Sequence, residues 1–266
     1  MKKLNTAIII VNHNNKNKII QLIESIYNYN NLKSSKIIFI QNKPSNFIKN
    51  YLKNFKEVIF IENKKIQGFS KNINDAIHLA QSSFNADYFL LLNPDIILKN
   101  NILSPFTEMI TNDSSIGIIG PKLLNENGTI QYSCRRFYNF RYVFIRMFRL
   151  SFIFGNQLEN QILMKDFNHN EKLDVDWISG AAMFFNKEFL NKVGMFDDKN
   201  YFMYGEDQDL CLRSWRNDLK VIYNPSVECY HSYARRGSSL AISKYSFYQL
   251  LSTVNMFKKF NFRLKR

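Results

Sequence analysis

The chain has 266 residues, of which 45% are hydrophobic and 22% are charged, and its formal net charge at pH 7 is +14. This composition is ordinary for a folded soluble protein with one substantial core. The three cysteines, Cys134, Cys211 and Cys229, are odd in number and far apart, which excludes a disulfide framework and a structural zinc site and favours a reducing compartment.

Strand-like and helix-like segments alternate along the first 120 residues. Short apolar runs predict strands at 7–11, 36–40, 58–61, 88–92 and 116–119, and helical spacing of apolar residues predicts helices at 18–27 and 72–80. Such alternation is typical of right-handed βαβ units. The expected fold class is therefore α/β, with a mostly parallel sheet flanked by helices.

The alternation is interrupted after Pro121. Residues 137–154 interleave aromatic residues with arginines, and residues 156–174 are more polar and predicted to be looped. Regular elements return with a strand at 181–185, a helix starting near Asp207, a strand at 221–223 and a last helix at 243–260.

We therefore predict one domain at 1–240, made of two halves at 1–120 and 121–240, with a basic, aromatic insertion at 137–174. An amphipathic helix and basic tail at 241–266 follow it. In that helix Phe247, Leu251, Val254 and Phe257 are predicted to lie on one stripe.

The positive charge implies attraction to nucleic acid, anionic lipid or phosphorylated substrates. Zinc-finger spacing, RNA-recognition aromatics and a helix-turn-helix are not apparent, so nucleic acid is disfavoured. The insertion and the tail predict a surface for anionic lipid or a polyprenyl-diphosphate acceptor, with a core helix and solvated edge as the alternative. Because no secretory signal or run of membrane-spanning length is seen, we expect a cytoplasmic protein, peripheral on the inner face of the membrane.

An acid follows a fully apolar run where Tyr88–Leu92 leads into Asn93, Pro94 and Asp95. Ligands of open α/β sheets bind at the carboxyl ends of the strands. A carboxylate there can hold Mg²⁺ or Mn²⁺, so Asp95 is the predicted metal ligand, and Asn93 can offer a carbonyl or a hydrogen bond to a sugar. The alternative is an ordinary Asn-Pro-Asp turn.

A second acidic group, Glu206, Asp207 and Asp209, opens the helix near residue 207. Acids at a helix start are favourable in any protein, so capping is the alternative interpretation. One acid to hold a metal and another to take a proton would suffice for metal-assisted group transfer, which favours an enzyme. Asp209 and Arg213 are four residues apart and are predicted to form a structural ion pair.

The loop after the first strand, Asn12 to Asn15, lacks the glycine patterns of dinucleotide and phosphate loops, so NAD and ATP are disfavoured. The segment from Gly68 to Asn74 opens a predicted helix. Its glycine would let the backbone approach a diphosphate closely, at a helix N-terminus that favours anions.

In this order the segments resemble the inverting family 2 glycosyltransferases of the GT-A fold, over residues 7–239. The resemblance implies that the domain at 1–240 is the catalytic domain, with a nucleotide-binding half at 1–120 and an acceptor half at 121–240. The most specific match is in the acceptor half, at 176–183, 193–197 and 204–213. Residues 118–124 and 131–136 look most like the bacterial rhamnosyltransferase-type branch. One departure stands at Gln41-Asn42, where the family has an acid before the asparagine, although a glutamine amide can still donate and accept hydrogen bonds.

The resemblance implies roles for individual residues. Asp207 would be the general base, with Glu206 beside it, positioning it or raising its pKa by charge repulsion. Asp95 and His231 would hold the metal. The donor-nucleotide residues would be Asn12, His13, Asn14, Gln41, Asn42, Gly68, Asn74 and Asn93. The acceptor or diphosphate would be contacted by Trp177, Gly180, Arg235 and Arg236.

The function that follows is inverting transfer of a sugar, dependent on Mg²⁺ or Mn²⁺, from a nucleotide-diphosphate donor to a glycan or polyprenyl-diphosphate-linked acceptor in bacterial cell-envelope polysaccharide synthesis. The branch implies dTDP-L-rhamnose as donor, with a UDP-hexose as the alternative. Two other classes stay open. A sugar-phosphate nucleotidyltransferase would be expected to carry a glycine-rich basic loop after the first strand, and a non-catalytic basic module would bind membrane or nucleic acid.

Overall fold

The computed structural model describes residues 5–138, 142, 157–232 and 244–264. Ten strands form one sheet in the order β3-β2-β1-β4-β11-β6-β12-β5, with β7 beside β6 and β9 beside β12. These strands are β1 (Thr6–Asn12), β2 (Ser35–Gln41), β3 (Val58–Glu62), β4 (Tyr88–Leu92), β5 (Ile96–Leu98), β6 (Ile116–Leu124), β7 (Ile130–Gln131), β9 (Leu173–Asp174), β11 (Ala182–Asn186) and β12 (Lys220–His231). A separate two-stranded sheet pairs β8 (Cys134–Arg135) with β10 (Trp177–Ile178).

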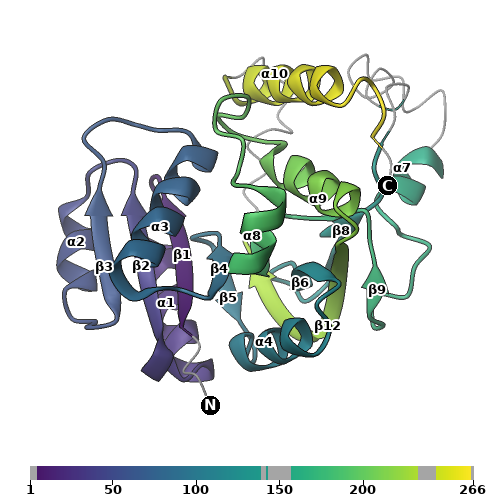
Figure 1. Ribbon diagram of the computed structural model, residues 1–266. Helices are drawn as coiled ribbons and strands as arrows, with labels where there is room; N and C mark the ends of the chain where they lie inside the picture. Colours follow the sequence, from purple (N-terminus) through teal and green to yellow (C-terminus); the bar gives the residue numbers. More distant parts are fainter. Residues whose placement is uncertain (1–4, 139–141, 143–156, 233–243, 265–266) are drawn as a thin grey trace.

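The two halves of the sheet differ in strand direction. In the N-terminal half β1, β2, β3 and β4 are parallel, as predicted, whereas β11 runs antiparallel to both β4 and β6. Figure 1 shows the N-terminal half in purple and blue on one side and the green second half on the other. The α/β class is confirmed, with a mixed sheet in the second half.

Helices flank this sheet on both faces. They are α1 (Asn17–Tyr29), the short 3₁₀ helix η1 (Leu32–Ser34), α2 (Asn46–Leu52), α3 (Phe69–Phe84), α4 (Leu103–Asn112), α7 (Gln157–Ile162), α8 (Lys187–Val193), α9 (Glu206–Arg216) and α10 (Lys244–Lys259). The last of them, α10, lies farther out, against α9 (Figure 1). Successive strand residues point to opposite faces. In β1, Ala7 and Ile9 therefore pack with α3, while Ile8 and Ile10 pack with α1 and α2. The continuous apolar run of β1 supplies both cores.

The last helix buries one face against α9. Met256, Phe257 and Phe260 pack with Tyr201 and Leu212 in a third cluster. Of the predicted apolar stripe, Phe257 is buried, whereas Phe247, Leu251 and Val254 are 62%, 45% and 40% exposed. Most of that stripe therefore faces outward, because the contact with α9 is made by the opposite side of the helix.

The predicted insertion at 137–174 lies partly outside the described residues. Its described part contains α7 and β9, so the prediction of a loop at 156–174 was incomplete. The domain limit at residue 240 stays a prediction. Within the described ranges, none of the helices has both the length and the apolar character needed to cross a bilayer.

Candidate active site

Strand pairing brings Asp95 and His231 together. β5 begins directly after Asp95 and pairs with the end of β12, where His231 lies opposite Ile96. The His231 Nε2 atom is 3.4 Å from Asp95 Oδ1, and the two side chains are 5% and 14% exposed. The backbone amide of Ser232 also donates to the Asp95 carbonyl, at 3.0 Å. The two predicted metal residues are thus adjacent although 136 positions separate them in the sequence.

Gln131 fixes the orientation of the His231 ring. Its Oε1 lies 2.6 Å from His231 Nδ1, while its Nε2 donates to Asn125 Oδ1 at 3.2 Å and to the His231 carbonyl at 3.4 Å. Because the amide nitrogen is used as a donor, Oε1 is the acceptor, and Nδ1 must carry the proton. The other ring nitrogen, Nε2, faces Asp95. Sequence reasoning missed Gln131, since its role depends on the pairing of β7 with β6.

This pair suits a divalent cation. A carboxylate and a neutral imidazole nitrogen are ligands that Mn²⁺ accepts. A metal-binding histidine usually donates its other ring N–H to an acceptor, as His231 does to Gln131. Within the part of the chain that the structure describes, three or more His, Cys, Asp or Glu side chains do not gather around one point. A cation on Asp95 and His231 would therefore need further oxygen ligands from a bound molecule or water.

Asp207 lies at the first turn of α9 and is held by backbone amides. Gly180 donates to its Oδ2 at 2.9 Å and Gln208 donates to its Oδ1 at 2.8 Å. Burial raises the pKa of the Asp207 carboxyl above its ordinary value, and the two amides and the Arg135 charge offset part of that rise. A side chain at Gly180 would place its Cβ 3.2 Å from Asp207 Cβ, so this position favours glycine by space.

Glu206 is the most unusual acid of the group. It is buried, and its Oε2 has no hydrogen-bond partner within the described residues. Burial, and then repulsion by Asp207, raise the pKa of Glu206 to about 8. Glu206 is therefore mostly protonated at neutral pH. The predicted effect of Glu206 charge on Asp207 is minor, because burial is the main cause of the Asp207 shift.

Asp209 is fully engaged in a structural network. It accepts from Arg213 Nε at 2.6 Å, from Lys259 Nζ at 2.6 Å and from the Tyr201 hydroxyl at 3.1 Å. The predicted ion pair with Arg213 is confirmed. Of the three acids on this turn, Asp207 is the one that is partly exposed, and backbone amides hold it.

One sheet edge links the two acidic positions. The Asn93 amide donates to the Ala181 carbonyl at 2.8 Å, next to Gly180, which holds Asp207. Asn93 itself is partly exposed. A cavity of about 570 Å³ lies next to these residues in the chain, and His231, Ser179, Arg135 and Gln131 are among its lining residues, whereas Asp95 and Asp207 do not line it. Asp95 and Asp207 therefore belong to adjoining parts of one region.

Arg135 belongs to this region although the sequence indicated only its charge. β8 pairs with β10, so that Arg135 lies opposite Trp177, with its guanidinium 4.9 Å from the ring centre. Trp177 is buried, and its Nε1 donates to the Arg136 carbonyl at 3.2 Å. The Trp177 ring therefore packs against the guanidinium of Arg135. The predicted contacts of Arg235 and Arg236 lie outside the described residues.

At the tips of the first two strands, the predicted nucleotide-binding residues Asn12, Gln41 and Asn42 form hydrogen bonds within the protein. Asn12 donates to Gln41 Oε1 at 2.8 Å, and Gln41 donates to the Lys43 carbonyl. Asn42 bonds the backbone of Gln67 through both ends of its amide. His13 and Asn14 are more accessible, being partly exposed and exposed. Asn12, Gln41 and Asn42 thus shape the loops, and His13 and Asn14 face outward.

Gly68 and Asn74 connect the nucleotide half to the acceptor half. A Cβ at Gly68 would lie 2.9 Å from the Phe202 carbonyl, and the Phe69 amide donates to that same carbonyl at 2.7 Å. The close backbone approach at this glycine is therefore to Phe202. The Asn74 amide exchanges two hydrogen bonds with the Phe196 backbone, at 2.9 and 3.1 Å.

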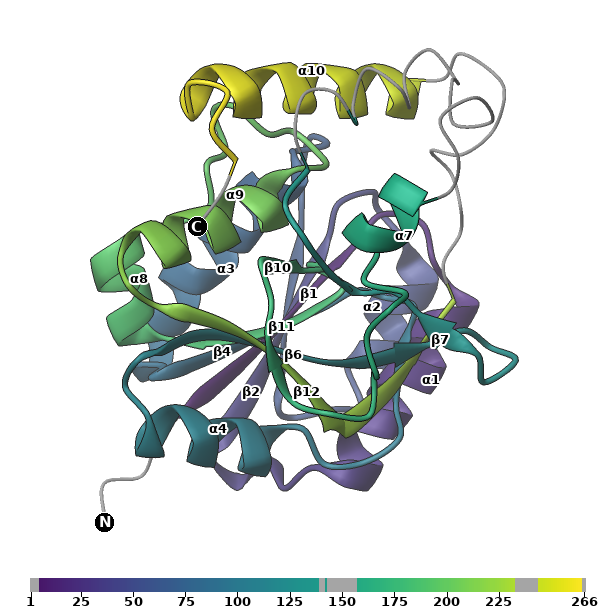
Figure 2. The same ribbon diagram turned by 90° about the vertical axis from the view of Figure 1, so that its right-hand side faces the viewer.

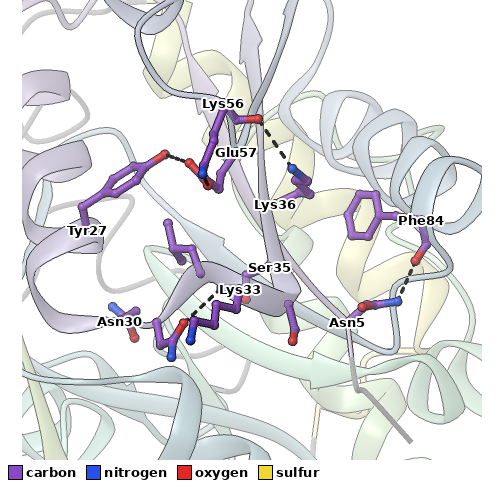
Figure 3. Close-up of a pocket in the computed structure, with 12 residues that line it drawn as sticks. Asn5, Tyr27, Asn30, Lys33, Ser35, Lys36, Lys56, Glu57 and Phe84 are labelled. Atoms are coloured by element: carbon purple, nitrogen blue, oxygen red, sulfur yellow. Dashed lines mark hydrogen bonds and ion pairs between the residues drawn. The ribbon is translucent and has the colours of Figure 1, made fainter.

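A second cavity, of about 590 Å³, lies at the opposite edge of the sheet, near the start of β1 and β2. Figure 3 shows its polar side chains in mutual contacts, with Tyr27 donating to Glu57 at 2.7 Å and Asn5 donating to the Phe84 carbonyl at 2.9 Å. The carboxyl-end edge is therefore the better candidate for the site.

Comparisons with known proteins identify the family. The family model described as glycosyltransferase like family 2 matches residues 4–245. The chain is 29% identical over 250 residues to Rhamnosyltransferase WbbL of Escherichia coli (strain K12), covering 92% of this chain and 90% of that protein. It is 23% identical over 229 residues to Low-salt glycan biosynthesis hexosyltransferase Agl10 of Haloferax volcanii, covering 85% and 66%.

Two solved structures share the fold. One is GalNAc-T7 with UDP, GalNAc and Mn²⁺, with a TM-score of 0.65 and 15% identity. The other is the mannosyltransferase PcManGT of Pyrobaculum calidifontis with GDP-Man and Mn²⁺, with a TM-score of 0.57 and 14% identity. They cover 91% and 88% of this chain, which spans 47% and 58% of theirs. From the family match and these relatives, the chain belongs to glycosyltransferase family 2 and is an enzyme of the GT-A fold.

Proposed function

We propose that this glycosyltransferase works with inversion and with a divalent metal, and that Asp207 is its general base. The observation that carries the proposal is the link from Asp95 and His231, through Asn93, Ala181 and Gly180, to Asp207. This link supports a site in which Asp95 and His231 hold the metal and the partly exposed Asp207 is the base. The parallel strands β1, β2 and β4 end at that same edge, where ligands of such sheets bind.

In the proposed reaction Asp207 takes the proton of the acceptor hydroxyl. The acceptor oxygen bonds to the anomeric carbon from the face opposite the leaving group, and the bond from that carbon to the diphosphate oxygen breaks, its electron pair leaving with the nucleoside diphosphate. Attack from the opposite face inverts the configuration. The raised pKa of Asp207 makes it a stronger base than an ordinary aspartate, and a positioned base contributes about 10²- to 10⁴-fold in rate.

Asp95 and His231 would hold Mg²⁺ or Mn²⁺, which when bound stabilises the negative charge of the diphosphate. Gln131 keeps His231 in the tautomer that offers Nε2. Glu206, being protonated at neutral pH, adds little negative charge near the diphosphate. A neutral Glu206 also leaves Asp207 as the base on this turn.

For the donor we propose dTDP-L-rhamnose, supported by the similarity to a rhamnosyltransferase over most of both chains. The alternative is a UDP-hexose, which the hexosyltransferase relative and the UDP-bound neighbour keep open. The proposed acceptor is a glycan, free or linked to polyprenyl diphosphate, in cell-envelope polysaccharide synthesis.

A thermal-shift panel of dTDP, UDP and GDP, each with and without Mn²⁺, tests the donor and the metal together. A ligand that binds the native state raises the melting temperature by mass action. We expect the largest rise with dTDP and Mn²⁺. A larger rise in melting temperature with UDP would favour a UDP-hexose as the donor in place of dTDP-L-rhamnose. Equal rises with and without Mn²⁺ would contradict the proposed metal dependence.

A further inference from the structure

Helix α10 carries two apolar faces, of which one is buried and one is exposed. The buried face packs on α9 through Met256, Phe257 and Phe260. The exposed face consists of Phe247, Leu250, Leu251 and Val254, which are 62%, 45%, 45% and 40% exposed. We call these four residues the outer stripe. Their spacing of three, four and seven residues places them along one side of the helix.

The helix that presents the outer stripe is firmly attached. Lys259 donates to Asp209 at 2.6 Å and to Asp197 at 2.7 Å, and Ser252 donates to the Met203 carbonyl at 3.0 Å. In Figure 1 and Figure 2, α10 lies along the outside of the molecule, above α9. Exposed apolar residues in such an ordered row on a fixed helix mark an interaction surface.

Basic residues follow the outer stripe toward the end of the helix. Lys258 is exposed and lies four residues beyond Val254, on the same side of the helix, and Arg263 is exposed just after the helix. Phe262, between them, is 62% exposed. The sequence has no acidic residue after Glu228, while it has lysine or arginine at 235, 236, 244, 258, 259, 263, 265 and 266. An apolar row with basic residues and without acids matches an anionic lipid surface.

We propose that the outer stripe of α10 docks the enzyme on an anionic membrane surface, with its apolar side chains in the headgroup boundary and Lys258 and Arg263 against lipid phosphates. A second copy of the chain is a poorer occupant, because it would bring an equally basic, acid-free segment against this one. The inference concerns a surface, and it does not rest on the proposed donor or metal.

The docking surface has a consequence for the acceptor side of the enzyme. A Cβ at Gly205, directly before Glu206, would lie 3.3 Å from Met256 Cε and 3.5 Å from Ser252 Cβ, so α10 packs against the turn that carries the acids. A membrane on the outer face of α10 would therefore lie beside the acceptor half. This placement suits an acceptor that is itself held at a membrane.

Vesicle flotation tests the proposal directly. Purified full-length protein is mixed with vesicles of phosphatidylcholine, alone or with phosphatidylglycerol. We expect the wild type to float with the anionic vesicles and less with the neutral ones. The variant F247S/L251S should partition into anionic vesicles about tenfold less, because binding scales with the apolar area that is inserted. The variant K258E/R263E should lose about fivefold for each basic residue removed, or more.

Matched controls lie on α2, on the far side of the molecule from α10 (Figure 1). Phe47 is 49% exposed, so F47S removes a comparable apolar group, and K49E/K53E changes two exposed lysines. All these positions are on the surface, and unchanged melting temperatures will show that the variants fold. Normal donor-induced thermal shifts in F247S/L251S will separate loss of docking from loss of the transferase site.

Three outcomes would overturn the proposal. The wild type could fail to float, the α10 variants could float as the wild type does, or F47S could lose as much as F247S/L251S. Light scattering identifies the other occupant, since a dimer that F247S/L251S converts to a monomer would assign the outer stripe to a second copy.

Discussion

The buried polar side chains at the tips of β1 and β2 differ from those at the start of α9 in whether their hydrogen bonds are satisfied. At the tips of β1 and β2, Asn12 and Gln41 are buried and bond to each other, so these amides already have partners. At the start of α9, Glu206 is also buried, but one of its oxygens has no partner within the described residues, and its pKa is raised to about 8. Satisfied polar groups build the frame, whereas a perturbed acid such as Glu206 marks the turn where chemistry is expected, next to Asp207.

The largest effect is expected for Asp207→Asn, which removes the base and keeps the shape of the side chain. Transfer should fall by about 10²- to 10⁴-fold. Donor-induced thermal shifts should be retained, because the contacts of Asp207 are on the acceptor side. Initial rates with saturating donor are the measurement, and a variant that transfers sugar at the wild-type rate would exclude Asp207 as the base.

The next effect is a pH-dependent stability difference for Glu206→Gln. The pKa of Glu206 is about 8 in the folded protein and its ordinary value is 4.5. Between these values the unfolded chain has lost the proton that the folded chain keeps, so the wild type loses stability as the pH rises. The glutamine lacks this loss, and the difference should reach on the order of 2–3 kcal/mol.

Urea unfolding of both proteins across this pH range measures that difference. The wild-type free energy of unfolding should fall relative to that of Glu206→Gln as the pH rises from 4.5 to about 8. Parallel curves would show that Glu206 is ionised in the folded protein at neutral pH.

A smaller loss is expected for Gln131→Ala, which removes the acceptor behind His231. Removing such a support lowers metal affinity by about 10- to 100-fold. Calorimetric titration with Mn²⁺ in the presence of nucleoside diphosphate measures it, with His231→Ala as the reference for loss of the ligand itself. Wild-type affinity in Gln131→Ala would mean that Gln131 supports only the fold.

The smallest of these effects should come from Gly180→Ala. The added methyl would lie 3.2 Å from Asp207 Cβ, so the carboxylate must shift by a few tenths of an ångström. We expect transfer to fall by about tenfold with little change in donor binding, since small displacements of a catalytic group are costly. Equal loss of donor binding would indicate a wider change in the fold.

The nucleotide half was predictable from the sequence because its signals are local. The apolar run Tyr88–Leu92 has polar residues directly after it, and β4 has those same limits. β12 was predicted only at 221–223 but extends from Lys220 to His231. Its polar residues, such as Asn224 and Glu228, are held in the strand by pairing with β6, which no local pattern reports.

The acidic residues of the site could be predicted from the sequence, but the residues that position or neighbour them could not. Asp95 and Asp207 follow or open regular elements, where a carboxylate stands out in the sequence. Gln131 and Arg135 act through short strands whose partners are far along the chain. The buried face of α10 could not be predicted for a related reason, because both of its sides are apolar and only the contact with α9 decides which is buried.

The central claim is that two functions meet at one sheet edge: Asp95 and His231 hold the metal, and Asp207 is the base. It is tested most directly by measuring Mn²⁺-dependent thermal shifts with donor, together with transfer rates, in Asp95→Ala and Asp207→Asn. The account predicts that both variants lose transfer, and that only Asp95→Ala loses the metal-dependent shift. An Asp95→Ala enzyme that keeps both the shift and its turnover would contradict it.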